Sequence, residues 1–72
     1  MQTLTMWTIY RDPDDYPGQY VARRWEARET PVATGDLHLA DSLEAIRALI
    51  PPGLARLPRY DGDDPCIVET WF

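Results

Sequence analysis

The sequence predicts an α+β fold: a small two-layer β-β-(β)-α-β domain in which an antiparallel sheet carries one helix on one face. Two segments rich in β-branched and aromatic residues open the chain, and a third such segment closes it. Between them, one segment repeats apolar residues at helical spacing. A chain of 72 residues has the length of one domain, so residues 1–72 are treated as a single domain.

The first two strands are predicted to form an antiparallel hairpin. Residues 3–10 (TLTMWTIY) are typical of a strand. Residues 11–18 (RDPDDYPG) hold two Pro, three Asp and a Gly, which favour a loop. Residues 19–29 form the second strand. Because consecutive strands most simply pair with each other, we expect a hairpin closed by this long loop.

The segment before the helix leaves one strand undecided. Residues 30–36 (TPVATGD) are typical of a turn. Residues 37–39 (LHL) alternate apolar and polar side chains, which is the pattern of a strand. Three residues are too few to decide whether this segment joins the sheet, so both topologies stay open.

One short helix follows. Asp41 is the predicted N-cap, with Glu44 three residues on, as in a capping box. An apolar stripe at helical spacing comprises Leu43, Ile46, Leu49 and Ile50. Pro51 and Pro52 end the helix after about nine residues. Such a helix is marginal alone and must lie on a sheet.

The remainder of the chain is predicted to return to the sheet. Residues 54–60 are expected to be extended and irregular, with the side chains of Leu54 and Leu57 buried. Residues 61–65 (DGDDP) form a loop, and residues 66–72 (CIVETWF) form the last strand. One helix covers only one face of a sheet, yet the strands carry large apolar side chains on both faces. An uncovered aromatic face tends to bind another surface, such as a protein partner or a second copy of the chain.

Composition excludes several classes of function. The formal net charge is −5, and all seven basic residues are Arg. This balance argues against general nucleic-acid binding and against adhesion to anionic membranes. No apolar run is long enough to span a bilayer, and no signal peptide is recognisable at the N-terminus, so a cytoplasmic location is expected. One Cys and one His cannot supply a tetrahedral zinc site, and no cofactor is expected.

The acidic loops are weak candidates for a metal site. The pattern Asp-x-Asp-Asp occurs twice, as Asp12, Asp14 and Asp15 and as Asp61, Asp63 and Asp64. Ca²⁺ and Mg²⁺ prefer such oxygen ligands, but neither loop fits an EF-hand. If residues 37–39 form a full strand, the two loops are expected at opposite ends of the sheet, and otherwise at the same end. Asp and Pro also simply form solvated turns, so we expect no metal site.

Two further constellations are expected to be structural. Arg23, Arg24 and Arg28 surround Trp25 in the sequence, which suggests stacking on single-stranded nucleic acid, but Arg23 and Arg24 point to opposite faces of a strand. Cross-strand pairing explains them as well. Cys66 and His38 are the only candidate nucleophile and base, and their spacing gives no reason for contact. We therefore expect a protein that is not an enzyme.

The layout resembles the HicB-like antitoxin fold. The matching pieces are GQYVA at residues 18–22, GD at residues 35–36 and DSLEAI at residues 41–46, so the similarity covers about residues 3–50. The Pro-Gly segment usual before the last turn is absent, as is the separate DNA-binding domain that many such antitoxins carry. The chain is also similar to small uncharacterised proteins of GC-rich bacteria or their phages. The resemblance implies protein binding and no more specific function.

These observations favour a non-enzymatic protein-interaction module or small regulator that uses an aromatic sheet face or a sheet edge. The residues expected to contact a protein partner or a second copy are Trp7, Trp25, Trp71, Phe72 and Arg24. The alternative is a small ligand- or metal-binding protein or enzyme that uses the acidic loops 12–15 and 61–64. For any one Trp, a place in the core is an equally good explanation.

Overall fold

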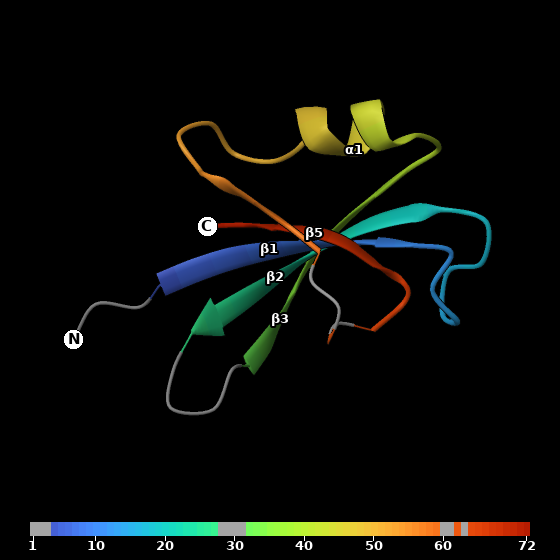
Figure 1. The fold of residues 1–72 in the computed structure, drawn as a ribbon, viewed down its shortest axis with the longest axis horizontal. Coiled ribbons are helices and arrows are strands. Elements are labelled where there is room, and N and C mark those ends of the chain that lie inside the picture. The colour runs from blue at the N-terminus through green and yellow to red at the C-terminus, as the bar shows by residue number, and fades with distance from the viewer. Residues whose placement is uncertain (1–3, 28–31, 60–61, 63) are drawn as a thin grey trace.

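The fold is a five-stranded antiparallel sheet with one short helix, which makes it an α+β or mostly β fold (Figure 1). The computed structural model describes residues 4–27, 32–59, 62 and 64–72. The elements are β1 (Leu4–Arg11), β2 (Tyr20–Ala27), β3 (Val32–Ala40), α1 (Leu43–Ala48), β4 (Arg56–Pro58) and β5 (Ile67–Trp71). The strand order is β3-β2-β1-β5-β4. Within the described residues, no helix is long and apolar enough to cross a membrane.

The predicted hairpin is confirmed, and the open question of the third strand is answered. β1 and β2 pair antiparallel from Leu4↔Ala27 to Arg11↔Tyr20. Residues 37–39 belong to β3, which pairs with β2 and is nine residues long. The turn predicted over residues 30–36 is therefore wrong from Val32 onward, while residues 30 and 31 lie outside the described residues.

A bulge explains how turn-forming residues fit into β3. The register shifts between Arg23 and Trp25, which pair with Leu37 and Ala33. Three residues of β3 thus lie opposite one residue of β2. A bulge accommodates extra residues without ending the strand. The hydrogen bonds to β2 on both sides of this irregularity outweigh the local turn preference.

Helix α1 is shorter than predicted and begins at a different cap. Ser42, rather than Asp41, is the N-cap, and its Oγ accepts a hydrogen bond from the Ala45 N–H at 3.1 Å. The helix has six residues instead of about nine. Its end is tightened, because the N–H groups of Leu49 and Ile50 donate to carbonyls only three residues back. A residue before proline avoids the α conformation, which explains why the helix stops short of Pro51.

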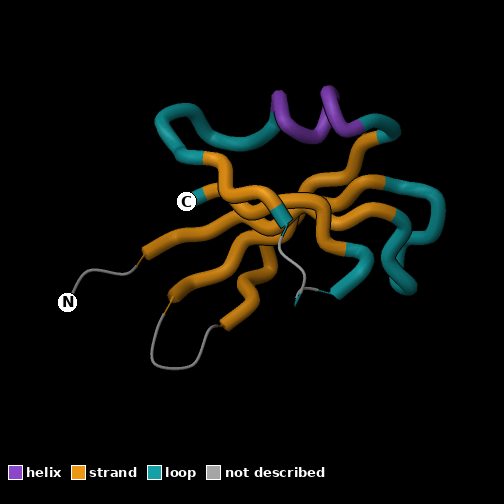
Figure 2. Tube along the Cα trace, viewed as in Figure 1, coloured by secondary structure: helices purple, strands orange, loops and turns teal. Residues whose placement is uncertain are grey.

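The core lies between α1 and one face of the sheet. The buried cluster comprises Trp7, Ile9, Ala22, Ile46 and Ile50. Figure 2 shows the helix and its flanking loops on the same side of the strands. Leu49 belongs to the apolar stripe that was predicted to face the sheet, but it is exposed. The tightened last turn of the helix rotates its side chain away from the sheet.

The segment after the helix contributes a strand that the sequence pattern does not reveal. β4 pairs with β5 in the register Arg56↔Trp71, Leu57↔Thr70 and Pro58↔Glu69. Leu54 packs against the core as predicted. Leu57 is 52% exposed, so its predicted burial is wrong. Strand alternation turns Leu57 to the face opposite α1, where no described helix lies. The predicted last strand is confirmed as β5.

Candidate functional site

The sheet face opposite α1 carries a mostly apolar surface, which we call the open face. The strand registers place the following side chains on it: Leu4, Met6, Thr8, Tyr10, Val21, Arg23, Trp25, Leu37, Leu39, Leu57 and Thr70. Phe72 follows by alternation, since its backbone exchanges two hydrogen bonds with Ala55 beyond the last paired residues. The open face therefore extends over all five strands.

Large apolar side chains on the open face reach solvent. Leu4 is 53% exposed and Leu39 is 42% exposed, at opposite ends of their strands. Phe72 is also exposed, and Trp25 is half-buried. Met6 is the register partner of Trp25, so an aromatic and a thioether lie side by side near the middle of the face. Large exposed apolar side chains that share one sheet face are a feature of many contact sites.

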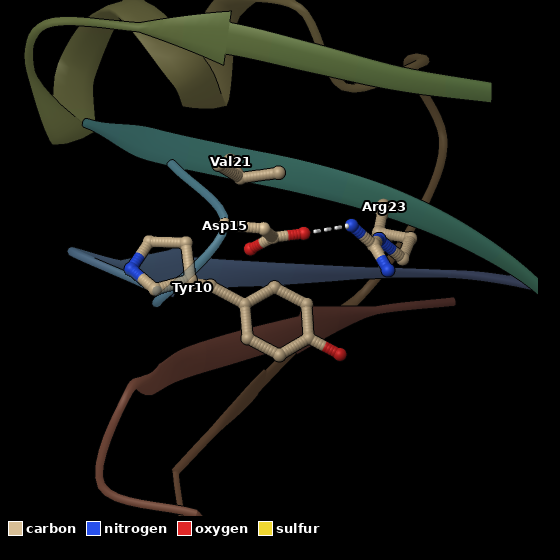
Figure 3. A pocket seen from close by; sticks show the side chains of 5 residues that line it. Tyr10, Asp15, Val21 and Arg23 are labelled. Atoms are coloured by element: carbon tan, nitrogen blue, oxygen red, sulfur yellow. Dashed lines mark hydrogen bonds and ion pairs between the residues drawn. The ribbon is translucent and has the colours of Figure 1, made fainter. Parts of the chain in front are cut away.

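One end of the open face is covered by the loop between β1 and β2. Asp15 of this loop forms an ion pair with Arg23 at 2.9 Å, beside Val21, which is only 1% exposed (Figure 3). Pro13 and Tyr10 complete a pocket of about 120 Å³. Sites for drug-sized ligands occupy roughly 300–1,000 Å³, so this pocket holds only a few atoms. The loop thereby hides part of the apolar face.

The β1–β2 loop and the described residues just before β5 lie at the same end of the sheet, although residues 37–39 form a strand. The Arg11 N–H donates to the Cys66 carbonyl at 2.7 Å, which joins the end of β1 to the start of β5. The expectation of opposite ends is therefore wrong. The cause is β4, because this additional strand reverses the chain direction once more before β5.

Three described acidic side chains of these loops, Asp12, Asp15 and Asp64, are engaged in turns or an ion pair. Asp12 accepts a hydrogen bond from the Gly18 N–H at 2.6 Å, and Asp64 accepts one from the Cys66 N–H at 2.9 Å. Within the described residues, no group of three or more His, Cys, Asp or Glu side chains is placed to hold a metal ion. Asp61 and Asp63 lie outside these residues.

The candidate nucleophile and base come from distant strands. Cys66 precedes β5 and His38 lies on β3, and two strands separate them in the sheet. The pKa of the Cys66 thiol is raised. Burial is the largest cause, and the hydrogen bond and negative charge of Asp64 act in the same direction. A raised pKa reduces the thiolate population that reacts. The imidazole of His38 stacks on Trp7, with ring centroids 5.1 Å apart.

The predicted interaction residues divide between the two faces. Trp7 is 6% exposed and belongs to the core, and Trp71 packs against that core. Arg24 lies on the same face and forms an ion pair with Asp36 at 3.1 Å. Trp25 and Phe72 lie on the open face. The structure therefore brings together only these last two at a surface that α1 leaves uncovered.

Sequence reasoning missed a buried carboxylate on the helix side of the sheet. Glu69 is 2% exposed and accepts hydrogen bonds from Arg47 Nε (2.9 Å), Arg47 Nη2 (2.6 Å) and Trp71 Nε1 (2.7 Å). Arg56 lies 3.8 Å from the same carboxylate. The Arg47 hydrogen bonds hold the pKa of Glu69 below its ordinary value, against the opposing effect of burial. A lone acid within an apolar strand is the signal that could have revealed this ion pair.

Comparison of the chain with protein-family models, with curated proteins and with solved structures finds no significant match. The function is therefore argued from the geometry of this chain.

Proposed function

We propose that this chain is a non-enzymatic protein-interaction module that contacts a protein partner through the open face. The observation that carries the proposal is the exposure of large apolar side chains there, among them Leu4, Leu39, Leu57 and Phe72. Burying such side chains against a partner contributes roughly 25 cal/mol for each Å² of apolar surface removed from water. No described helix lies over this face to supply that burial within the chain.

Trp25 is the proposed anchor of the contact. Tryptophan is enriched among residues that dominate the binding energy of interfaces. Trp25 is half-buried between its neighbours, and Met6 is its register partner on β1. A side chain already held by neighbours loses little conformational freedom on binding. Trp7, Trp71 and Arg24 are left out of the proposed contact, since core packing and ion pairs account for them.

The perturbed titratable groups support a role without catalysis. The Glu69 carboxylate is enclosed by donors from α1, β4 and β5, and it is nearly inaccessible to a substrate. Cys66 has a raised pKa, which is the opposite of an activated nucleophile. Perturbed groups of a catalytic site usually line an accessible cleft.

Native mass spectrometry of the protein taken from its own cells tests the proposal. We expect a complex with a second protein, and we expect the variant Leu39→Thr/Leu57→Thr to lose it, because threonine suits a strand but removes apolar contact area. Leu49→Thr is the matched control, as Leu49 is an exposed leucine at the end of α1. Circular dichroism checks that each variant folds. A complex that survives both open-face substitutions would contradict the proposal.

A further inference from the structure

The two edges of the sheet differ in how they are protected. β4 forms one edge, is three residues long and ends at Pro58, which has no N–H to offer. β3 forms the other edge and is nine residues long. No described strand pairs with its outer side, so alternate N–H and C=O groups of β3 point outward, which is the geometry that accepts another strand.

The regular part of this edge is residues 37–40. The bulge interrupts β3 between Ala33 and Leu37, whereas residues 37–40 pair with β2 in unbroken register. Leu37 and Leu39 lie on the open face, and His38 and Ala40 lie on the helix face. A strand added here would place apolar side chains beside the two leucines, because cross-strand neighbours on one face interact directly.

The charged side chains within residues 36–44 are all acidic, and Arg23, the register partner of Leu37, is already paired with Asp15. Asp36, Asp41 and Glu44 flank or follow residues 37–40, and residues 36–44 contain no Lys or Arg. Asp41 and Glu44 are exposed, and the exposed Asp36 has Arg24 as its ion-pair partner. The whole chain carries a net charge of −5. A second copy would bring the same carboxylates together, whereas a basic segment would complement them.

We infer that residues 37–40 of β3 bind an extended basic segment of the partner by β-strand addition. The segment alternates apolar residues with Arg or Lys, and its apolar side chains lie beside Leu37 and Leu39 and extend the open face. This inference rests on the proposed function and names the chemistry of its partner. Backbone hydrogen bonds supply the strand pairing, and the flanking carboxylates select the basic side chains.

A capped hexapeptide of alternating Arg and Val is the probe. We expect it to shift the backbone amide NMR signals of residues 37–40 and to slow hydrogen exchange at alternate amides of that segment. The same peptide with alternate backbone amides N-methylated removes the hydrogen-bond donors and should bind at least about tenfold more weakly. A capped Glu-Val hexapeptide should bind more weakly still. Equal binding of the methylated peptide would overturn strand addition.

Matched substitutions separate the apolar and electrostatic contributions. Leu39→Thr should weaken binding of the Arg-Val peptide, and Leu49→Thr, an exposed leucine at the end of α1 and outside the open face, should not. Asp41→Asn should weaken it about two- to fivefold, and Asp14→Asn, which removes the same charge from the β1–β2 loop, should leave it unchanged. Circular dichroism verifies the fold of all four. Equal effects within either pair would contradict binding at this edge.

Failure of this inference is distinguishable from failure of the proposed function. If the cellular complex depends on Leu39 and Leu57 but the peptide does not perturb residues 37–40, the edge assignment is wrong and the interaction module stands. If size-exclusion chromatography with light scattering shows a homodimer whose β3 amides are protected, a second copy occupies the edge and the basic segment is wrong. Absence of any complex contradicts the proposed function itself.

Discussion

The carboxylate of Glu69 joins three elements through its hydrogen bonds and charge. Arg47 of α1 contacts both of its oxygens, Trp71 of β5 donates to one of them, and Arg56 of β4 lies nearby. Burial of an isolated carboxylate costs several kcal/mol, and a guanidinium that meets both oxygens is the arrangement that best offsets this cost. Arg47 itself remains partly exposed, so water screens its side of the pair.

Neutralising Glu69 is expected to destabilise the fold. Glu69→Gln keeps the shape of the side chain but removes its charge and turns an amide N–H₂ toward Arg47. We expect the free energy of unfolding to fall by about 1–3 kcal/mol, measured by urea denaturation. Glu44→Gln, on the exposed side of the same helix, serves as the control and should change it by less than about 0.5 kcal/mol. Equal losses in the two variants would contradict the role of the buried pair.

The same carboxylate predicts a pH dependence of stability. Hydrogen bonds from Arg47 lower the pKa of folded Glu69 below its ordinary value of 4.5. The unfolded state therefore takes up this proton first as the pH falls, and the stabilisation by ionised Glu69 is complete above pH 4.5. It is lost as the pH falls through the lower pKa of the folded state.

Urea denaturation at several pH values measures this effect. The difference in unfolding free energy between the native chain and Glu69→Gln should be constant near neutral pH and should shrink in acid. A difference that stays constant throughout the acid range would show that the charge of Glu69 does not contribute.

At the scale of the element, α1 depends on its cap and on its contacts with the sheet. A helix of six residues is unstable alone, and Ile46 and Arg47 attach it to the sheet through the core and through Glu69. The cap decides where the helix begins. Ser42 satisfies an N–H of the first turn that no helical carbonyl can reach.

Two neighbouring substitutions test the cap. Ser42→Ala should lower the free energy of unfolding by about 1 kcal/mol, because the Ala45 N–H loses its acceptor. Asp41→Ala should cost less, since the Asp41 side chain precedes the cap and is exposed. Thermal or urea denaturation measures both. A larger loss for Asp41→Ala would restore Asp41 as the functional cap.

At the scale of the whole molecule, the last strand of the sequence lies inside the sheet. β5 pairs with β1 on one side and with β4 on the other. It also contributes Glu69, Trp71 and Val68 to the helix side of the sheet. The fold therefore closes only when the end of the chain has joined its beginning, through contacts that are distant in sequence.

Truncation tests this arrangement. Deleting residues 66–72 should abolish cooperative unfolding, measured by circular dichroism, because β1 loses a neighbouring strand and Arg47 loses its carboxylate. Deleting Phe72 alone should preserve the fold, since it removes an exposed side chain and two backbone hydrogen bonds with Ala55. A folded product of the longer deletion would contradict the central role of β5.

Local sequence patterns by themselves determined the hairpin and the division of β1 and β2 into two faces. This is a consequence of the period of two along a strand, which holds whatever the strand packs against. The helical spacing of Ile46 and Ile50 likewise predicted which side of the helix faces the core. The sequence also indicated that the strands carry more apolar side chains than one helix can cover. In the structure, these extra side chains lie on the open face.

Only the tertiary structure decided which of these features are buried and how the strands meet. Pairing with β2 extended β3 through turn-forming residues, because ladder hydrogen bonds to a neighbouring strand outweigh local propensity. β4 brought the acidic loops to one end and exposed Leu57, and α1 brought Arg47 to Glu69. A local pattern specifies which residues share a face, but the burial and charge partners of that face come from segments distant along the chain.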